Sequence, residues 1–161
     1  MHVELVRVPA FRVACLEHRG SLERLGESRQ RFIQWRQSKG LSPSPEHRTY
    51  ACFHSDPKAT APQDQRVDLC VSTEIDLTGE QPICEKWLGT GRFARVRHQG
   101  SPEQIPAAEW LYSDWLPESG ELLDESRPMM FHFVNAGPNL SPRELETDVY
   151  LPLQERTVAD R

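Results

Sequence analysis

The sequence has little of what marks proteins that bind nucleic acids or cross membranes. Its basic residues are scattered, their longest cluster is Arg29-Gln30-Arg31, and the formal net charge is −5. Because contact with a phosphate backbone requires a basic face, we do not expect nucleic acid to be a direct partner. Residues 1–7 contain no long apolar run, so the sequence predicts no signal peptide, no membrane span and a cytoplasmic location.

Signatures of catalysis and of metal binding are also missing. There is no G-x-S-x-G motif and no glycine-rich phosphate loop, and Gly89-Thr90-Gly91 is only a turn. The cysteines form no C-x-x-C pair and have no histidine at zinc-binding spacing, which favours free, buried thiols at Cys15, Cys52, Cys70 and Cys84. We therefore expect no catalytic residue, no metal and no cofactor.

The second half of the sequence resembles the first half at an offset of 80 residues. The segment 12–21 aligns with 92–101 without a gap, and this self-similarity predicts a tandem duplication. We expect a single domain, residues 1–161, made of two repeats at about 1–78 and 79–155. Two related halves meet at a seam, which is a favoured place for a small-molecule pocket. The offset also pairs His18 with His98, Glu23 with Glu103, Trp35 with Trp115, Gly40 with Gly120, Phe53 with Phe133, Pro62 with Pro142 and Asp68 with Asp148.

Each repeat shows the same order of predicted elements, two strands, a helix and two further strands. The first repeat has expected strands at 3–8, 12–17, 49–54 and 66–76, with a helix at 22–38. The second has expected strands at 82–87, 92–97, 129–134 and 147–153, with a helix from 102 to 116. Strand pairs covered by one helix per repeat predict an α+β fold, and one repeat alone could not bury both faces of its sheet.

Two pairs of equivalent residues have structural explanations that we favour. Trp35 and Trp115 lie near the apolar stripes of the two helices and are interpreted as core anchors. His18 and His98 lie at the strand-to-helix turns. They could be catalytic there, but their presence in both repeats favours a structural role, in which each ring satisfies a backbone carbonyl.

Trp110 lies off the apolar stripe of the second predicted helix. At about 100° per residue it points about 160° away from the centre of that stripe. It needs another surface to cover it, which is the other repeat, a ligand, a partner or simply a loop. The stripe itself comprises Ile105, Ala108, Leu111, Tyr112, Trp115 and Leu116.

The segment 127–135 is rich in large, soft side chains. Strand alternation places Phe131 and Phe133 on one face and Met130 and His132 on the other. One face must meet the helix and the other the seam, and a register slip of one residue would exchange them. Two interpretations stay open, a plain core or a pocket lined with aromatic rings. The candidate ligand-binding residues are Phe131, Phe133, Phe53, Trp110, Tyr150 and Trp87.

Short motifs spread over the whole chain, in a fixed order and spacing, carry a resemblance to a known family. They are Val13-Ala14, His18-x-Gly20, Phe32-x-x-Trp35, Phe53-x-x-Asp56-Pro57, Arg66–Val71, Gly91–Ala94, Trp115–Gly120, Arg127-Pro128 and Tyr150–Leu153. In these motifs the chain resembles the GyrI-like small-molecule-binding proteins, whose domain is shared with effector-binding modules of AraC-type and MerR-type transcription regulators. The resemblance implies two pseudo-symmetric strand–helix–strand–strand units with mainly antiparallel sheets, and a groove between them that takes amphipathic, often cationic, aromatic compounds.

One departure from the family pattern bears on ligand choice. Family members usually carry Phe-Glu-x-Tyr after the Arg-Pro pair, and the glutamate is the acidic group of their pocket. Here Phe131 takes the glutamate position and Phe133 the tyrosine position. A ring face attracts a cation by only about 0.5–2 kcal/mol, so we expect a bias towards neutral or weakly basic aromatic ligands. Another acid, such as Glu17 or Glu74, could compensate.

The resemblance also implies two alternative functions. Some members of the family are hydrolases of strained electrophilic rings that use the pocket glutamate, and others bind DNA gyrase and inhibit it. Without that carboxylate we expect no enzyme. The expected function is that of a stand-alone effector-type binding protein. Its partners would be a small aromatic ligand and either DNA gyrase or another regulator.

Overall fold

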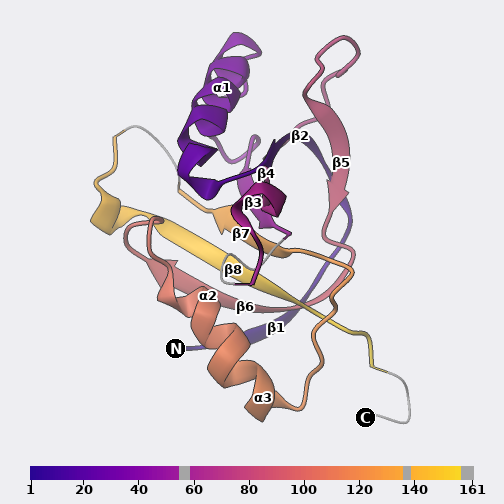
Figure 1. The fold of residues 1–161 in the computed structure, drawn as a ribbon, viewed down its shortest axis with the longest axis vertical. Helices are drawn as coiled ribbons and strands as arrows, with labels where there is room; N and C mark the ends of the chain where they lie inside the picture. The colour runs from indigo at the N-terminus through magenta and orange to yellow at the C-terminus, as the bar shows by residue number, and fades with distance from the viewer. Residues whose placement is uncertain (55–58, 136–138, 157–161) are drawn as a thin grey trace.

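The computed structural model describes residues 1–54, 59–135 and 139–156, so the expected strand end at Asp56-Pro57 lies outside the described residues. The described residues form one eight-stranded antiparallel sheet in the order β1-β6-β8-β7-β3-β4-β2-β5 (Figure 1). This arrangement confirms the α+β class and the mainly antiparallel pairing. Within the same residues, no helix combines the length and the apolar character that a membrane span requires.

The elements follow the order that the repeats predict. The first half has β1 (Glu4–Val8), β2 (Phe11–Arg19), α1 (Leu25–Ser38), β3 (Thr49–Phe53) and β4 (Arg66–Ser72), with short 3-10 turns at Leu22–Arg24 and Pro62–Asp64. The second half has β5 (Cys84–Leu88), β6 (Gly91–Gln99), α2 (Pro106–Trp110), a π-helical turn η3 (Leu111–Trp115), α3 (Leu116–Ser119), β7 (Met129–Phe133) and β8 (Glu146–Leu153), with a 3-10 turn at Pro142–Glu144.

The strand registers repeat at the same 80-residue offset as the sequence. In the first half Val13 lies opposite Ser72, and in the second half Phe93 lies opposite Pro152. The two halves join where β3 pairs with β7, and there Ala51 lies opposite its own equivalent, Phe131. A pseudo-two-fold axis therefore passes between Ala51 and Phe131.

The first strand of each half is exchanged with the other half. β1 pairs with β6, and β5 pairs with β2, so each opening strand extends the sheet of the opposite repeat. The linkers after the two strands approach each other closely at Pro9 and Gly89. A Cβ on Gly89, whose φ is +86°, would lie 2.5 Å from the Pro9 carbonyl oxygen, so glycine alone fits this crossing.

The two faces of the sheet bury different cores. On the helix-bearing face, α1 covers one cluster and α2–α3 another, centred on Phe32 and Leu111 respectively (Figure 1). On the opposite face, side chains from both edge strands, such as Val6 of β1 and Leu88 of β5, pack on one cluster that contains Tyr50 and Met130. Because β1 and β5 are at opposite ends of the strand order, the sheet must curl to bring them together. We call its inner surface the concave face.

The strand-to-helix turns confirm the structural interpretation of the two histidines. Nε2 of His18 donates to the Ser21 carbonyl at 2.9 Å, and Nε2 of His98 donates to the Ser101 carbonyl at 3.1 Å. A carbonyl only accepts, so Nε2 carries a proton, and in the tautomer with its single proton there Nδ1 of His18 accepts from the Ser28 hydroxyl at 2.7 Å. The helices that follow are less alike, because the second begins at Pro106 rather than at 102.

A network of charged side chains stabilises the concave face beside Cys52. Asp68, whose side chain is 2% exposed, contacts His54 at 2.7 Å, Arg66 at 3.1 Å and Lys86 at 3.2 Å. Burial alone would raise the pKa of Asp68, but hydrogen bonds from His54 and Arg66 outweigh it and lower the pKa to about 2. In the folded protein Asp68 therefore stays ionised at pH values so low that the same carboxyl group in the unfolded chain is already protonated.

Asp68→Asn is expected to lower the free energy of unfolding at pH 7 by about 2 kcal/mol, since each unit of pKa shift corresponds to about 1.4 kcal/mol. The depressed pKa stabilises the fold above the unfolded pKa of about 4, and this contribution is lost as pH falls towards 2. Urea unfolding at pH 7 and pH 3 measures both effects. The exposed Asp64→Asn is the control, and an equal loss of stability in the two variants at pH 7 would contradict the network.

The exchange of β1 gives a second prediction. Val6 packs against the concave cluster, whereas its neighbour Leu5 is 56% exposed. Val6→Lys is expected to lower the free energy of unfolding by about 1–2 kcal/mol, because it removes a partly buried apolar side chain. Leu5→Lys should change it by less than about 0.5 kcal/mol. Thermal denaturation of both variants tests this, and equal behaviour would mean that β1 does not cover the cluster.

Candidate functional site

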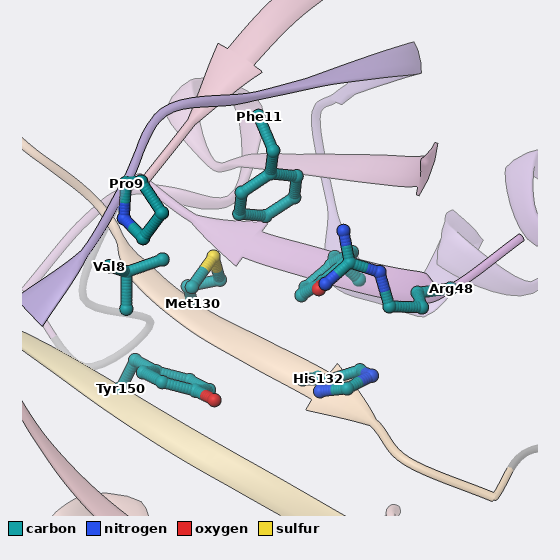
Figure 2. A pocket seen from close by; sticks show the side chains of 8 residues that line it. Val8, Pro9, Phe11, Arg48, Met130, His132 and Tyr150 are labelled. Carbon is teal, nitrogen blue, oxygen red and sulfur yellow. The ribbon is translucent and has the colours of Figure 1, made fainter. Parts of the chain in front are cut away.

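A pocket of about 210 Å³ opens on the concave face, next to the pseudo-two-fold axis (Figure 2). Its volume is somewhat larger than the roughly 150 Å³ cavity that holds benzene in an engineered protein core. Figure 2 shows Val8 and Pro9 at one end and the guanidinium of Arg48 with the ring of His132 at the other. The end of β1 supplies Val8, the linker after it supplies Pro9 and the start of β2 supplies Phe11. The remaining lining residues are Arg48, Tyr50, Met130, His132 and Tyr150.

Aromatic rings in contact form much of the wall of this pocket. The Tyr50 ring stacks on His132, with centroids 4.6 Å apart and planes inclined by 23°, and it meets Phe11 at 4.9 Å. The guanidinium carbon of Arg48 lies 5.0 Å from the centre of the Phe11 ring and 5.6 Å from that of Tyr50. These are distances at which a cation is attracted to a ring face.

The polar groups of the pocket are held in defined protonation states. Burial raises the pKa of Tyr50 to about 12, against the opposite effect of Arg48, so its hydroxyl stays protonated at neutral pH. Burial also lowers the pKa of His132, against the opposite effect of Asp148. His132 is therefore neutral at pH 7 and gains its charge only in more acidic solution.

Four of the predicted ligand-binding residues lie on the other, helix-bearing face. Phe131 is 9% exposed and its ring lies 4.8 Å from that of Phe53. Phe53 and Phe133 are partly exposed, and both pack against the cluster under α1 and the cluster under α2–α3. Trp110 packs against the second of these clusters. We call this set, Phe53, Trp110, Phe131 and Phe133, the aromatic floor.

The wheel-based expectation for the second helix is wrong at two positions. Trp110 packs towards the core, while Tyr112, placed in the apolar stripe, is 51% exposed. The cause is the π-helical turn at Leu111–Trp115, whose hydrogen bonds span five residues instead of four. With that spacing Trp110 and Trp115 face the same way, and a constant 100° rotation no longer describes the helix.

The two remaining predicted residues lie away from the aromatic floor. Tyr150, on β8, lines the concave pocket. Trp87 lies on the edge strand β5, is 61% exposed, and donates from Nε1 to Glu85 at 3.0 Å. The six residues named from the sequence therefore divide between two faces and one edge of the sheet.

Sequence reasoning missed most of the concave pocket. Arg48 and Tyr50 follow the proline-rich stretch 42–45, and the pattern there predicted only a strand. Strand alternation did place Met130 and His132 on the opposite face of the strand from Phe131. This was the available signal in the sequence for the concave face. Phe11 had no signal, because its equivalent in the second repeat is Gly91.

Carboxylates and thiols near these surfaces are already engaged or buried. Glu17, a candidate to replace the family's pocket acid, lies on the concave face and contacts Arg66 and Lys86, each at 2.9 Å. Glu74 is exposed. The cysteines are free, and the described residues contain no cluster of His, Cys, Asp and Glu arranged for a metal ion.

Comparison with known proteins agrees with this architecture. A family model described as a GyrI-like small molecule binding domain matches residues 1–154. The probable transcriptional regulator YgiV of Escherichia coli (strain K12) is 36% identical over 155 residues, which is 95% of this chain and 96% of YgiV.

Several solved structures share the fold at low sequence identity. EcmrR in its DNA complex superposes with a TM-score of 0.76 at 14% identity, over 96% of this chain and 58% of that one. This chain thus spans little more than half of EcmrR. A hydrolase from Listeria innocua gives a TM-score of 0.66 at 11% identity over 94% of this chain and 91% of that one. SAV2435 bound to tetraphenylphosphonium gives 0.65 at 10% identity over 96% and 94%.

The family match covers nearly the whole described chain, and the relative in Escherichia coli exceeds one third identity over 96% of its length. The repeated registers and the two helix-covered halves fit the same assignment. The chain belongs to the GyrI-like small-molecule-binding domain family.

Proposed function

We propose that this protein binds amphipathic aromatic compounds on the aromatic floor, and that it takes neutral ones at least as readily as cationic ones. The observation that carries the proposal is the position of Phe131. Phe131 lies beside the pseudo-two-fold axis, opposite Ala51, and its ring lies 4.8 Å from that of Phe53, at the position where the family pattern has a carboxylate. The protein thereby lacks the buried charge that would select a cation at this point.

The energetics of the floor support this preference. When a bound ligand removes one aromatic side chain of the protein from water, the gain is on the order of 1.5–3 kcal/mol. This gain does not depend on the ligand's charge. A cation gains only about 0.5–2 kcal/mol more from a ring face, and it loses hydration when it enters. Phe53 and Phe133 are only partly buried and contact both halves, so a bound ring would bridge the two repeats.

The relationship to YgiV supports a regulatory context for this binding. In that context the protein either sequesters a compound or passes its presence to a partner. SAV2435, which shares the fold, is bound to tetraphenylphosphonium in its solved structure, and this cation is therefore a suitable probe. Tyr150 and Trp87 remain predicted ligand contacts, but they lie away from the floor, Tyr150 in the concave pocket and Trp87 on the edge strand β5.

Phe131→Glu is expected to shift the preference towards cations. Wild type should bind triphenylphosphine oxide, which is neutral, at least as tightly as tetraphenylphosphonium. In the variant the affinity for the cation should rise relative to the neutral compound by about tenfold or more, because a buried carboxylate then pairs with the charge. Calorimetry with both compounds measures the ratio.

Leu5→Glu adds the same charge at an exposed site and is the matched control. Phe53→Leu, which removes a ring without adding charge, should weaken both compounds about equally and serves if Phe131→Glu does not fold. An unchanged ratio in folded Phe131→Glu, or unchanged affinities in Phe53→Leu, would show that ligands do not contact the floor.

Two other activities implied by the family predict different results. Inhibition of DNA gyrase would appear as reduced supercoiling when the purified protein is added. Hydrolysis would appear as turnover of an electrophilic substrate that Trp110→Leu or His132→Gln abolishes. The fold shared with the Listeria innocua hydrolase makes the second assay worthwhile.

A further inference from the structure

We propose that the concave pocket is a second binding site, separate from the aromatic floor, and that it takes small aromatic carboxylates. The two surfaces lie on opposite faces of the sheet, since Tyr50 and Met130 alternate with Ala51 and Phe131 along β3 and β7. The pocket of about 210 Å³ and its ring-lined walls fit a single aromatic ring. A positive charge at one end of the pocket narrows the class of ligand further.

Arg48 supplies that charge and differs from the other arginines of this face. Arg97 holds Asp148 with contacts of 2.8 and 3.0 Å, and Arg95 contacts Glu4 at 2.6 Å. Arg66 is likewise paired with Asp68. Within the part of the chain that the structure describes, Arg48 makes no ion pair, and its guanidinium instead lies over the rings of Phe11 and Tyr50.

The charge of Arg48 is therefore not neutralised by a neighbouring carboxylate. Asp148, the acid across from His132 in the β7–β8 register, is already held by Arg97. A guanidinium presents a planar fork of N–H donors that matches the two oxygens of a carboxylate. Among ligands of this size, an aromatic ring bearing a carboxylate uses both the ring-lined walls and the free cation.

The neighbouring polar groups complete the selection. The Tyr50 hydroxyl is held protonated by burial and can donate to an anion. His132 stacks on the Tyr50 ring and is faced by Asp148 of β8, Arg97 of β6 and Arg48. When the solution becomes more acidic, His132 gains a proton and adds a second positive charge at the same end. Affinity for the carboxylate should therefore increase as pH falls, as long as the ligand stays ionised.

Benzoate and its uncharged isostere benzamide are the probes for this site. We expect wild type to bind benzoate at least tenfold more tightly than benzamide, measured by ¹⁵N-edited NMR titration at pH 7. Arg48→Gln, which keeps much of the stem and removes the charge, should reduce benzoate affinity at least tenfold and leave benzamide unchanged. Arg31→Gln, an exposed residue of α1, removes the same charge elsewhere and should change neither.

Three outcomes would overturn the proposal. These are no benzoate binding at millimolar concentration, equal affinity for the two probes, and an unchanged benzoate affinity in Arg48→Gln. Repeating the titration at pH 5.5 should tighten benzoate binding in wild type and not in His132→Gln. Phe131→Glu separates this site from the aromatic floor. If benzoate binds there instead, that variant will weaken it, whereas a ligand in the concave pocket will be unaffected.

Discussion

The pairing of β3 with β7 is the constraint on which both candidate sites depend. In the strand order these two strands link β4 of the first half to β8 of the second, so their hydrogen bonds make one sheet from two repeats. Ala51 and Phe131, equivalent in sequence, are opposite each other there. The same pairing places Phe53 next to Phe131 on the helix-bearing face and Tyr50 against His132 on the concave face.

Strand alternation assigns each side chain of this junction to one face. Because side chains alternate with a period of two residues, a slip of one residue would move Phe131 to the concave face and His132 to the helices. The linkers after β1 and β5 cross at Pro9 and Gly89, where a side chain on Gly89 would collide with the backbone. Pro9 lines one end of the concave pocket, so this crossing also shapes a binding surface.

The repeat in the sequence predicted the equivalent registers of the two halves, and two other features of the fold escaped it. The 80-residue offset reproduces the registers of β2–β4 and β6–β8, because equivalent residues such as Val13 and Phe93 occupy equivalent places. The exchange of β1 and β5 was not predictable, since alternation says that a strand forms but not which strand it joins. Nor was the π turn at Leu111–Trp115, because a helical wheel assumes constant rotation.

For the sites, the aromatic floor was accessible to sequence reasoning because Phe131 and Phe133 stand in a dense apolar run. Arg48 was not, since a single exposed arginine after a proline-rich stretch has no periodic signal. Its importance appears only when the neighbouring arginines are seen to have partners. That information is a property of the folded surface and of pairings between residues far apart, such as Arg97 with Asp148.

Because the two repeats differ in sequence, the two ends of the concave pocket differ in chemistry. The axis that relates Ala51 to Phe131 also relates the cross-strand pair Tyr50–His132 to the pair Cys52–Met130, so one side is aromatic and basic and the other carries sulfur. Arg48 corresponds to Pro128, so among the described residues that line the pocket the guanidinium charge lies at one end. In a strictly two-fold pocket, two opposite orientations of a ligand would have equal energy. Here the anionic group and the ring prefer different ends, so a bound molecule has one favoured orientation, which distinguishes a receptor from a general apolar cavity.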